Sequence, residues 1–315
     1  MNADVFAEWL LRQGQRVART TSTYWHSDAW GVYQAFPYHA LIEPSEAELD
    51  EMFFRHRAAA LRYALPPECS QGCPSYAIVC EASDYDMQRL GYRTRKNVRR
   101  GLRACQIEQI SFRRLVEQAW ELRLDALERQ GRRIKITHSL WRKRYMSTAG
   151  LEGFEAWAAL VEGRIAGYVV TCRWDDCIYF LDQQSHRDYL HLNVNNALTY
   201  TVSRNAAARP GVKLLFYGLA SLDAPARVAE FKFHMGYAAK PIRQRVVFHP
   251  YLAVLANRFS YAAVKKLSEW MPADRRLSKA TGMLRLWLEE KSPCCRALRC
   301  GALGGEVESS SSSLS

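Results

Sequence analysis

Short apolar segments between residues 156 and 248 constrain the fold of this chain more than any other feature of its sequence. Their alternating or continuous apolar patterns are typical of strands, and Glu162-Gly163 and Asp175-Asp176 supply turns between the first three. The expected strands are 156–161, 165–173, 177–183, 212–217 and 242–248, and the expected helices are 193–208 and 225–235. This order predicts an α/β (α+β) unit in which helices flank a mixed sheet.

The first half of the chain carries regular patterns of its own. A capping serine, early acidic residues and apolar positions at helical spacing predict a helix from Ser45 to Leu65, ended by Pro66-Pro67. The other expected elements are a helix at Phe6, Trp9 and Leu10, strand and turn within 24–38, a buried strand at 76–82, and helices at 112–130 and 140–146. A chain of 315 residues with these elements is long enough for two lobes.

Positive charge is concentrated in two regions of the chain. The formal net charge is +12, and the run LGYRTRKNVRRGLR from Leu90 to Arg103 holds six Lys or Arg and no acidic residue. Residues 251–300 hold ten Lys or Arg against four Asp or Glu. These regions favour an anionic partner, such as a nucleotide, RNA or an acidic lipid surface.

Targeting signals and metal motifs do not stand out in the sequence. We find no leader pattern and no apolar stretch of bilayer-spanning length, and therefore expect a cytoplasmic protein. Nine cysteines show no paired CxxC motifs, which favours reduced thiols. The spacing of Cys69 and Cys73 with Cys294, Cys295 and Cys300 matches no established zinc site, so we expect no metal and no permanently bound cofactor.

Four sequence runs carry a resemblance to a known family. The hairpin EGRIAGYVV and the closing EFKFHMGY look like the core of the GNAT superfamily of acyltransferases. The run RTRKNVRRGLRACQIEQI, followed by AWELRLDALERQGR, is similar to the two-lobed Fem-like branch, in which a basic helix joins two GNAT-like lobes. The resemblance implies a GNAT-like lobe with a basic linker helix at 1–105, an acyltransferase domain at 106–250, and a basic helical tail at 251–315 with a disordered serine-rich end.

The resemblance also implies where a donor would bind. The co-substrate would be acyl-CoA, such as acetyl-CoA, carried along the edge of a strand that we place at Gly167, Tyr168, Val169, Val170 and Thr171. The stretch LHLNVN stands where the family usually has a glycine-rich pyrophosphate loop, so Asn193, Asn195 and Asn196 are the expected contacts. Lys232 stands where many GNAT enzymes have a tyrosine that protonates the leaving thiolate. It would contact a donor phosphate or a substrate carboxylate, or else it is a surface cation.

Three residues are candidates for proton transfer. Asp182 ends an apolar strand and would deprotonate an amine as a partly buried carboxylate, or else it caps a turn. His186 would act as a base or contact a phosphate, or else it is a solvated loop residue. Tyr217 ends a strand where active-site groups often emerge, although a buried tyrosine with one satisfied hydroxyl is equally ordinary.

Two basic surfaces have alternative interpretations. Arg95, Asn97, Arg99 and Arg100 would bind a phosphate-rich donor or the backbone of tRNA, or else form a solvated helix face. The tail from Tyr251 to Leu288 mixes apolar and basic residues. It would make peripheral contact with a membrane, or else pack its apolar stripe on the body.

Three functions remain open from the sequence. The first is acyl-CoA-dependent N-acylation of a small-molecule amine or amino sugar in a cell-envelope or polysaccharide pathway. The second is a Fem-type transferase that uses aminoacyl-tRNA. The third is a GNAT relative without activity that binds nucleic acid or a membrane surface.

Overall fold

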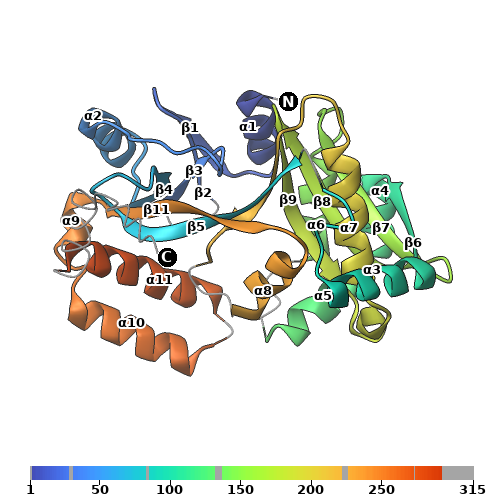
Figure 1. Ribbon diagram of the computed structural model, residues 1–315. Helices are drawn as coiled ribbons and strands as arrows, with labels where there is room; N and C mark the ends of the chain where they lie inside the picture. Colours follow the sequence, from blue (N-terminus) through green and yellow to red (C-terminus); the bar gives the residue numbers. More distant parts are fainter. Residues whose placement is uncertain are drawn as a thin grey trace, which may run out of the picture.

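The computed structural model describes residues 2–27, 31–82, 85–131, 137–221, 226–272 and 274–292. Within these residues eleven strands form one mixed sheet in the order β1-β2-β3-β4-β11-β5-β10-β9-β8-β7-β6 (Figure 1). The strands are β1 Arg16–Arg19, β2 Tyr24–Ser27, β3 Val32–Phe36, β4 Ala60–Leu65, β5 Cys73–Glu81, β6 Gln106–Ile110, β7 Phe154–Val161, β8 Arg164–Trp174, β9 Cys177–Ser185, β10 Leu214–Leu219 and β11 Ala238–Phe248. The expected GNAT-like mixed sheet is therefore present.

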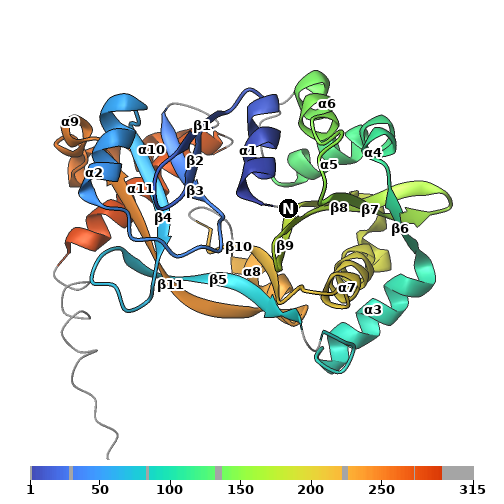
Figure 2. The ribbon, with the colours of Figure 1, turned by 90° about the horizontal axis from the view of Figure 1, so that it is seen from above.

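Helices cover both faces of this sheet. They are α1 Ala3–Arg12, α2 Glu46–Asp50, η1 Glu51–Arg55, α3 Tyr92–Ala104, α4 Phe112–Gln118, α5 Trp120–Arg129, α6 His138–Met146, η3 Arg187–Leu192, α7 Val194–Ala207, α8 Ala226–His234, α9 Pro250–Ala253, α10 Arg258–Trp270 and α11 Arg275–Lys291. In Figure 2, α7 and α3 lie on one face of strands β6 to β9, and α4, α5 and α6 lie on the other. No helix among the described residues is long and apolar enough to cross a bilayer.

Each half of the sheet contains one pair of parallel neighbouring strands that are joined by a helical connection. β3 and β4 are parallel neighbours joined through α2 and η1, and β9 and β10 are parallel neighbours joined through α7. Between these pairs lie two strands from opposite parts of the chain. β11 pairs with β4 and β5, and β5 pairs in turn with β10. The first and second halves of the chain are thus interleaved at the centre, and the division at 105 and 250 stays a prediction.

Most expected elements are confirmed, but the long helix from Ser45 to Leu65 is wrong. The helix begins at the expected capping serine, whose hydroxyl accepts a hydrogen bond from the Glu48 amide. It ends at Arg55, and Arg57 adopts a left-handed backbone. Residues 60–65 form β4, which β3 and β11 flank on both sides. Burial between two strands overrides the helical propensity of ALRYAL.

The expected helix at 112–130 is interrupted, and a strand precedes it. Ala119 separates α4 from α5 and has a non-helical backbone. The short segment QIEQI before α4 forms β6, which pairs with β7. With β6 counted, β9 is the fourth strand of this half of the sheet and β8 is the third.

Helix α3 packs closely against α7. A Cβ atom added at Gly101 would lie 2.5 Å from the Asn193 carbonyl oxygen and 2.9 Å from the Ala197 Cβ. Val98, one turn earlier, is fully buried in the same interface as Ala197. Only glycine allows the backbones to approach this far, so α3 is fixed beside the amino end of α7.

Candidate functional site

Strands β9 and β10 diverge near the middle of the sheet. Their parallel pairing runs from Leu214↔Cys177 to Phe216↔Tyr179 and ends there. Beyond it, residues 180–185 of β9 pair with β8 on one side, and their other edge faces no strand within the described residues. This free edge holds backbone groups that can bind an extended ligand.

A β-bulge lies on each side of the divergence. The pairing of β9 with β8 skips Leu181, and the pairing of β10 with β5 skips Tyr217. Bulges bend their strands and increase the local twist. The two bulges therefore explain why β9 and β10 separate at this point.

The expected donor edge at Gly167–Thr171 is wrong. These residues lie on β8, which pairs with β7 on one side and with β9 on the other, so their amides are already committed. Gly167 has a packing role, because an added Cβ would lie 2.8 Å from Ser185 Oγ and 3.0 Å from Val194 Cγ1. The free edge belongs to β9, one strand further along.

Lys232, on α8, reaches the divergence from the far side of β10. Its Nζ donates a hydrogen bond to the Tyr217 carbonyl oxygen at 3.2 Å and lies 4.5 Å from the centre of the Tyr217 ring. Burial lowers the pKa of the Lys232 ammonium to about 8. A lysine with this pKa exchanges its proton readily near neutral pH.

Tyr217 is held as a neutral hydroxyl. Its ring stacks on Phe180 at 4.7 Å, with the planes 12° apart, and meets Tyr237 edge-on. Its hydroxyl donates a hydrogen bond to Gln183 Oε1. Burial raises the pKa of the Tyr217 hydroxyl. The residue therefore positions its neighbours more readily than it transfers a proton, and its expected catalytic role stays a prediction.

Gln183 connects the free edge of β9 to α7, and the sequence analysis missed it. Its amide nitrogen donates to Thr199 Oγ1 at 2.9 Å and to Asn195 Oδ1 at 3.3 Å. Ser185, two residues along, also donates to Asn195. The only signal in the sequence is a pair of glutamines directly after an apolar strand.

Asp182 points to the opposite face and is enclosed by cations and hydroxyls. Arg123 Nη1 lies 3.7 Å from its Oδ1, while Tyr145 donates to Oδ2 at 2.7 Å and Gln184 to Oδ1 at 3.0 Å. Burial opposes ionisation, but Arg123, Arg144 and these hydrogen bonds outweigh it and lower the pKa of the Asp182 carboxyl. A carboxylate stabilised in this way is a weak base.

The same cluster contains more positive than negative charge. Among the described residues no hydrogen-bond partner meets the buried Nε of Arg123 or of Arg144. Arg144 lies near the rings of Trp9 and Tyr145, at 6.0 and 5.8 Å from their centres. Two guanidinium groups thus share one buried carboxylate.

The amino end of α7 is arranged differently from a glycine-rich loop. Asn193 adopts the left-handed backbone that the sequence analysis allowed for, with φ of 61°. The Asn195 side chain is occupied by Gln183 and Ser185, and Asn196 donates to Met235 Sδ at 3.5 Å. Within the described chain no side chain caps this helix end. Its first amides remain suited to an anion.

His186 has a local structural role. Its Nδ1 accepts a hydrogen bond from the Asp188 amide at 3.3 Å and so caps η3. No contact joins it to Asp182 or Tyr217 within the described residues. The structure does not bring it together with the other two catalytic candidates.

The four anion-binding candidates lie along α3. Arg95 donates to the Leu90 carbonyl oxygen at 3.0 Å and is half-buried, as is Asn97. Arg99 and Arg100 are exposed, immediately before Gly101 and its contact with Asn193. The two exposed arginines therefore lie on the helix that packs, through Gly101, against the uncapped end of α7.

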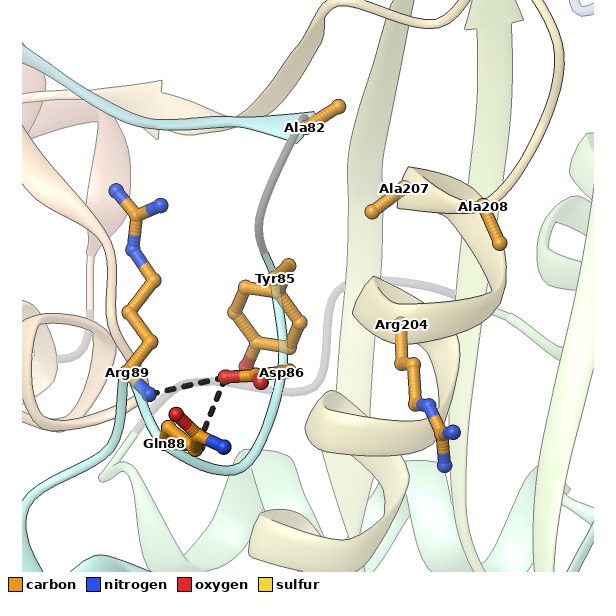
Figure 3. Close-up of a pocket in the computed structure, with 8 residues that line it drawn as sticks. All are labelled: Ala82, Tyr85, Asp86, Gln88, Arg89, Arg204, Ala207 and Ala208. Atoms are coloured by element: carbon orange, nitrogen blue, oxygen red, sulfur yellow. Dashed lines mark hydrogen bonds between the residues drawn. The ribbon is translucent and has the colours of Figure 1, made fainter.

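Two cavities lie away from the divergence. The first, of about 700 Å³, lies between the segment after β5 and the carboxyl end of α7, with Arg89 and Arg204 on opposite sides (Figure 3). The second, of about 570 Å³, includes His186 and the turn between β7 and β8. Neither is lined by Lys232 or Tyr217, and we assign the site from the strand divergence and its buried side chains.

The described ranges contain neither a candidate metal-binding cluster nor a disulfide bond. No group of three or more His, Cys, Asp or Glu side chains gathers there. None of Cys69, Cys73, Cys80, Cys105, Cys172 and Cys177 forms a disulfide bond, and burial raises the pKa of Cys105 to about 11. Cys294, Cys295 and Cys300 lie outside the described residues.

Comparison with known proteins identifies a family model over part of the chain and several structures with a similar fold. Residues 92–224 match a family model described as an acetyltransferase (GNAT) domain. A search of curated proteins gave no match. Among solved structures, FemX has 11% identity and a TM-score of 0.55, covering 79% of this chain and 92% of its own.

Two further structures share the fold. The C-terminal domain of a candidate lysylphosphatidylglycerol synthetase from Agrobacterium fabrum has 10% identity and a TM-score of 0.54, covering 77% of this chain and 87% of its own. L-PGS from Bacillus licheniformis has 12% identity and a TM-score of 0.52, with 78% and 91% covered. A GNAT acetyltransferase domain model thus matches residues 92–224, and the chain shares its overall fold with these three structures.

Proposed function

We propose that the protein transfers an acyl group from acyl-CoA to the amine of a small molecule, at the divergence of β9 and β10, with Lys232 as the proton carrier. The observation that carries this proposal is the position of the Lys232 ammonium, which lies against Tyr217 beside the free edge of β9. The coarser assignment to acyl transfer rests on the GNAT domain itself.

The proposed reaction needs one proton carrier with a pKa near that of the groups it serves. Neutral Lys232 accepts a proton from the ammonium of the acceptor, and the free amine attacks the thioester carbon. The C–N bond forms, the C–S bond breaks, and the nitrogen of the new amide releases its second proton to solvent. The thiolate then takes the proton from the lysine, which returns to its neutral form.

Two features support CoA as the donor. The free edge of β9 offers backbone groups for the extended pantetheine arm, and the uncapped amino end of α7 suits its pyrophosphate. Arg99 and Arg100 add positive charge beside that helix end.

Calorimetric titration with acetyl-CoA and longer acyl-CoAs tests the donor. We expect dissociation constants below millimolar, and about tenfold weaker binding for the Arg99→Glu/Arg100→Glu variant. The matched control reverses two exposed arginines on other helices, Arg55 and Arg113. Absence of binding by the unmodified chain would reject acyl-CoA.

A second candidate donor is aminoacyl-tRNA. The cations of α3 favour it, because most of them are exposed and the helix has no acidic residue, which also suits a nucleic-acid backbone. The similarity in fold to FemX and to a protein named as a lysylphosphatidylglycerol synthetase adds support, since the latter name implies transfer of lysine. Filter retention of charged tRNA, lost in the Arg99→Glu/Arg100→Glu variant and kept in the control, would favour this donor over acyl-CoA.

A further inference from the structure

Helix α10 is the most exposed regular element of the tail. None of its residues is buried, and it touches the rest of the protein mainly through half-buried Ser260, Tyr261, Val264 and Ser268. Figure 1 shows α10 outside α11, further from the sheet. Two hydrogen bonds to the Asn257 side chain, from the Phe259 and Ser260 amides, define its start.

Helix α11, by contrast, is anchored to the sheet. Met283 and Leu286 pack with Val246 of β11, and Trp287 donates to the Ala256 carbonyl oxygen at 3.1 Å. Arg245 Nε also lies 3.2 Å from Glu290 Oε1. α10 packs on this anchored helix and forms the outer layer.

The outward face of this layer combines large apolar side chains with cations. Phe259 and Trp270 are 88% and 72% exposed, and Lys266 Nζ lies 5.4 Å above the Trp270 ring. Positions 259, 263, 266 and 270 recur at steps of four and three, so they share one side of the helix. The remaining exposed apolar residues of α9, α10 and the residues next to them are Tyr251, Leu252, Val254, Leu255, Leu267 and Met271.

We infer that this face, residues 251–271, docks on the surface of an anionic lipid bilayer. Helix α10 contains three cations, Arg258, Lys265 and Lys266, and one acidic residue, Glu269. Its net positive charge complements acidic headgroups. Exposed Phe, Trp and Leu beside lysines are typical of helices that lie in the interfacial plane. The thirteen residues of α10 extend about 20 Å, too short to cross a bilayer, so the helix lies along its surface.

The charge and the exposed apolar side chains of this face argue against two other occupants. A second copy docked through the same face would bring like cations together, which costs affinity. RNA would meet the cations but would leave Val254 and Leu255 facing a polar backbone. Of the three occupants, only an anionic lipid surface suits both the cations and the exposed apolar side chains of this face. The inference does not depend on the proposed reaction.

Co-sedimentation of the full chain with vesicles tests the inference. We expect binding to vesicles that contain phosphatidylglycerol and weak binding to phosphatidylcholine alone. The Phe259→Ser/Trp270→Ser variant should lower binding about tenfold or more, and Arg258→Glu/Lys266→Glu should lower it by a similar factor only on the anionic vesicles. These side chains are exposed, so thermal unfolding should be unchanged.

The matched control removes two exposed apolar side chains elsewhere, in the Tyr92→Ser/Leu140→Ser variant, on α3 and α6. It should bind vesicles as the unmodified chain does. Absence of binding by the unmodified chain, or an equal loss in the control, would overturn the inference. Analytical sedimentation of the same variants identifies the rival occupant, because a dimer that Phe259→Ser/Trp270→Ser dissociates would assign the face to a second copy.

Discussion

The Nζ of Lys232 donates a hydrogen bond to the carbonyl oxygen of Tyr217 at 3.2 Å and lies 4.5 Å from the centre of the Tyr217 ring. Tyr217 is also the residue that the pairing of β10 with β5 skips. The lysine therefore lies at the bend where β10 leaves β9. The bend of β10 therefore places the Lys232 amine at the point where the sheet diverges.

The pH dependence of acyl transfer should follow the Lys232 side chain. Because burial lowers its pKa to about 8, the neutral base form accumulates above that pH, and the rate should rise with pH to a plateau there. Lys232→Met should lower kcat about a hundredfold or more and remove this rise, with little change in donor KM. Lys240→Met, at an exposed position, is the control. A variant of Lys232 that keeps the pH-dependent rise would reject the lysine as the proton carrier.

The same lysine should affect stability in a defined pH window. Its pKa is lowered from an ordinary value near 10.5 to about 8, so the unfolded chain holds the proton between these values while the folded chain does not. The stability that this group contributes is therefore fully present above pH 10.5, and it is lost as the pH falls through the folded-state pKa of about 8. Lys232→Met should therefore raise the free energy of unfolding at pH 7 by about 1–2 kcal/mol, with the gain shrinking toward pH 10. Chemical denaturation at both pH values measures this difference.

The strands between residues 156 and 248 could be predicted because their apolar runs are separated by turn residues. Glu162 and Asp175 adopt the left-handed backbone that such turns require. Residues 60–65 could not be assigned in this way, because ALRYAL is compatible with a helix and only its pairing with β3 and β11 makes it a strand. Long-range pairing of this kind leaves little trace in local sequence.

The site was harder to predict than the fold, for two physical reasons. β6 is short and weakly apolar, so it was not expected as a strand, and the sequence alone does not reveal that β9 is the fourth strand of this half of the sheet. Lys232 and Tyr217 lie fifteen residues apart on a helix and a strand, and only the folded chain brings them together. Residue type alone pointed to Asp182, whose charged surroundings the sequence does not reveal.

Replacing Asp182 should test structure and catalysis separately. Asp182→Asn leaves Arg123 and Arg144 buried without their carboxylate, and should destabilise the fold by about 3–5 kcal/mol. The lowered pKa of this carboxyl stabilises the fold above the ordinary Asp range, and that contribution is lost as pH falls below it. The variant should therefore lose less stability on acidification than the unmodified chain does. Asp188→Asn, whose side chain is exposed, is the control.

Activity per folded molecule then separates the two roles of Asp182. If Lys232 carries the proton, Asp182→Asn should retain a kcat much closer to that of the unmodified chain than Lys232→Met does. The measurement compares initial rates below the unfolding temperature of each variant. A loss in kcat equal to that of Lys232→Met, at full folding, would restore Asp182 as the base.

The contact between α3 and α7 should control both stability and donor binding. Alanine at position 101 gains about 1 kcal/mol of helix propensity over glycine, but its Cβ would lie 2.5 Å from the Asn193 carbonyl oxygen. Because that overlap is with backbone, steric cost should win, and Gly101→Ala should lower the free energy of unfolding by about 1–3 kcal/mol. A displaced α3 would also move Arg99 and Arg100 away from the amino end of α7, so acyl-CoA should bind more weakly. Gly91→Ala, where an added Cβ meets nothing within 4 Å, should change neither property by as much. Equal stability and donor affinity in the two variants would show that the close approach of these helices does not matter.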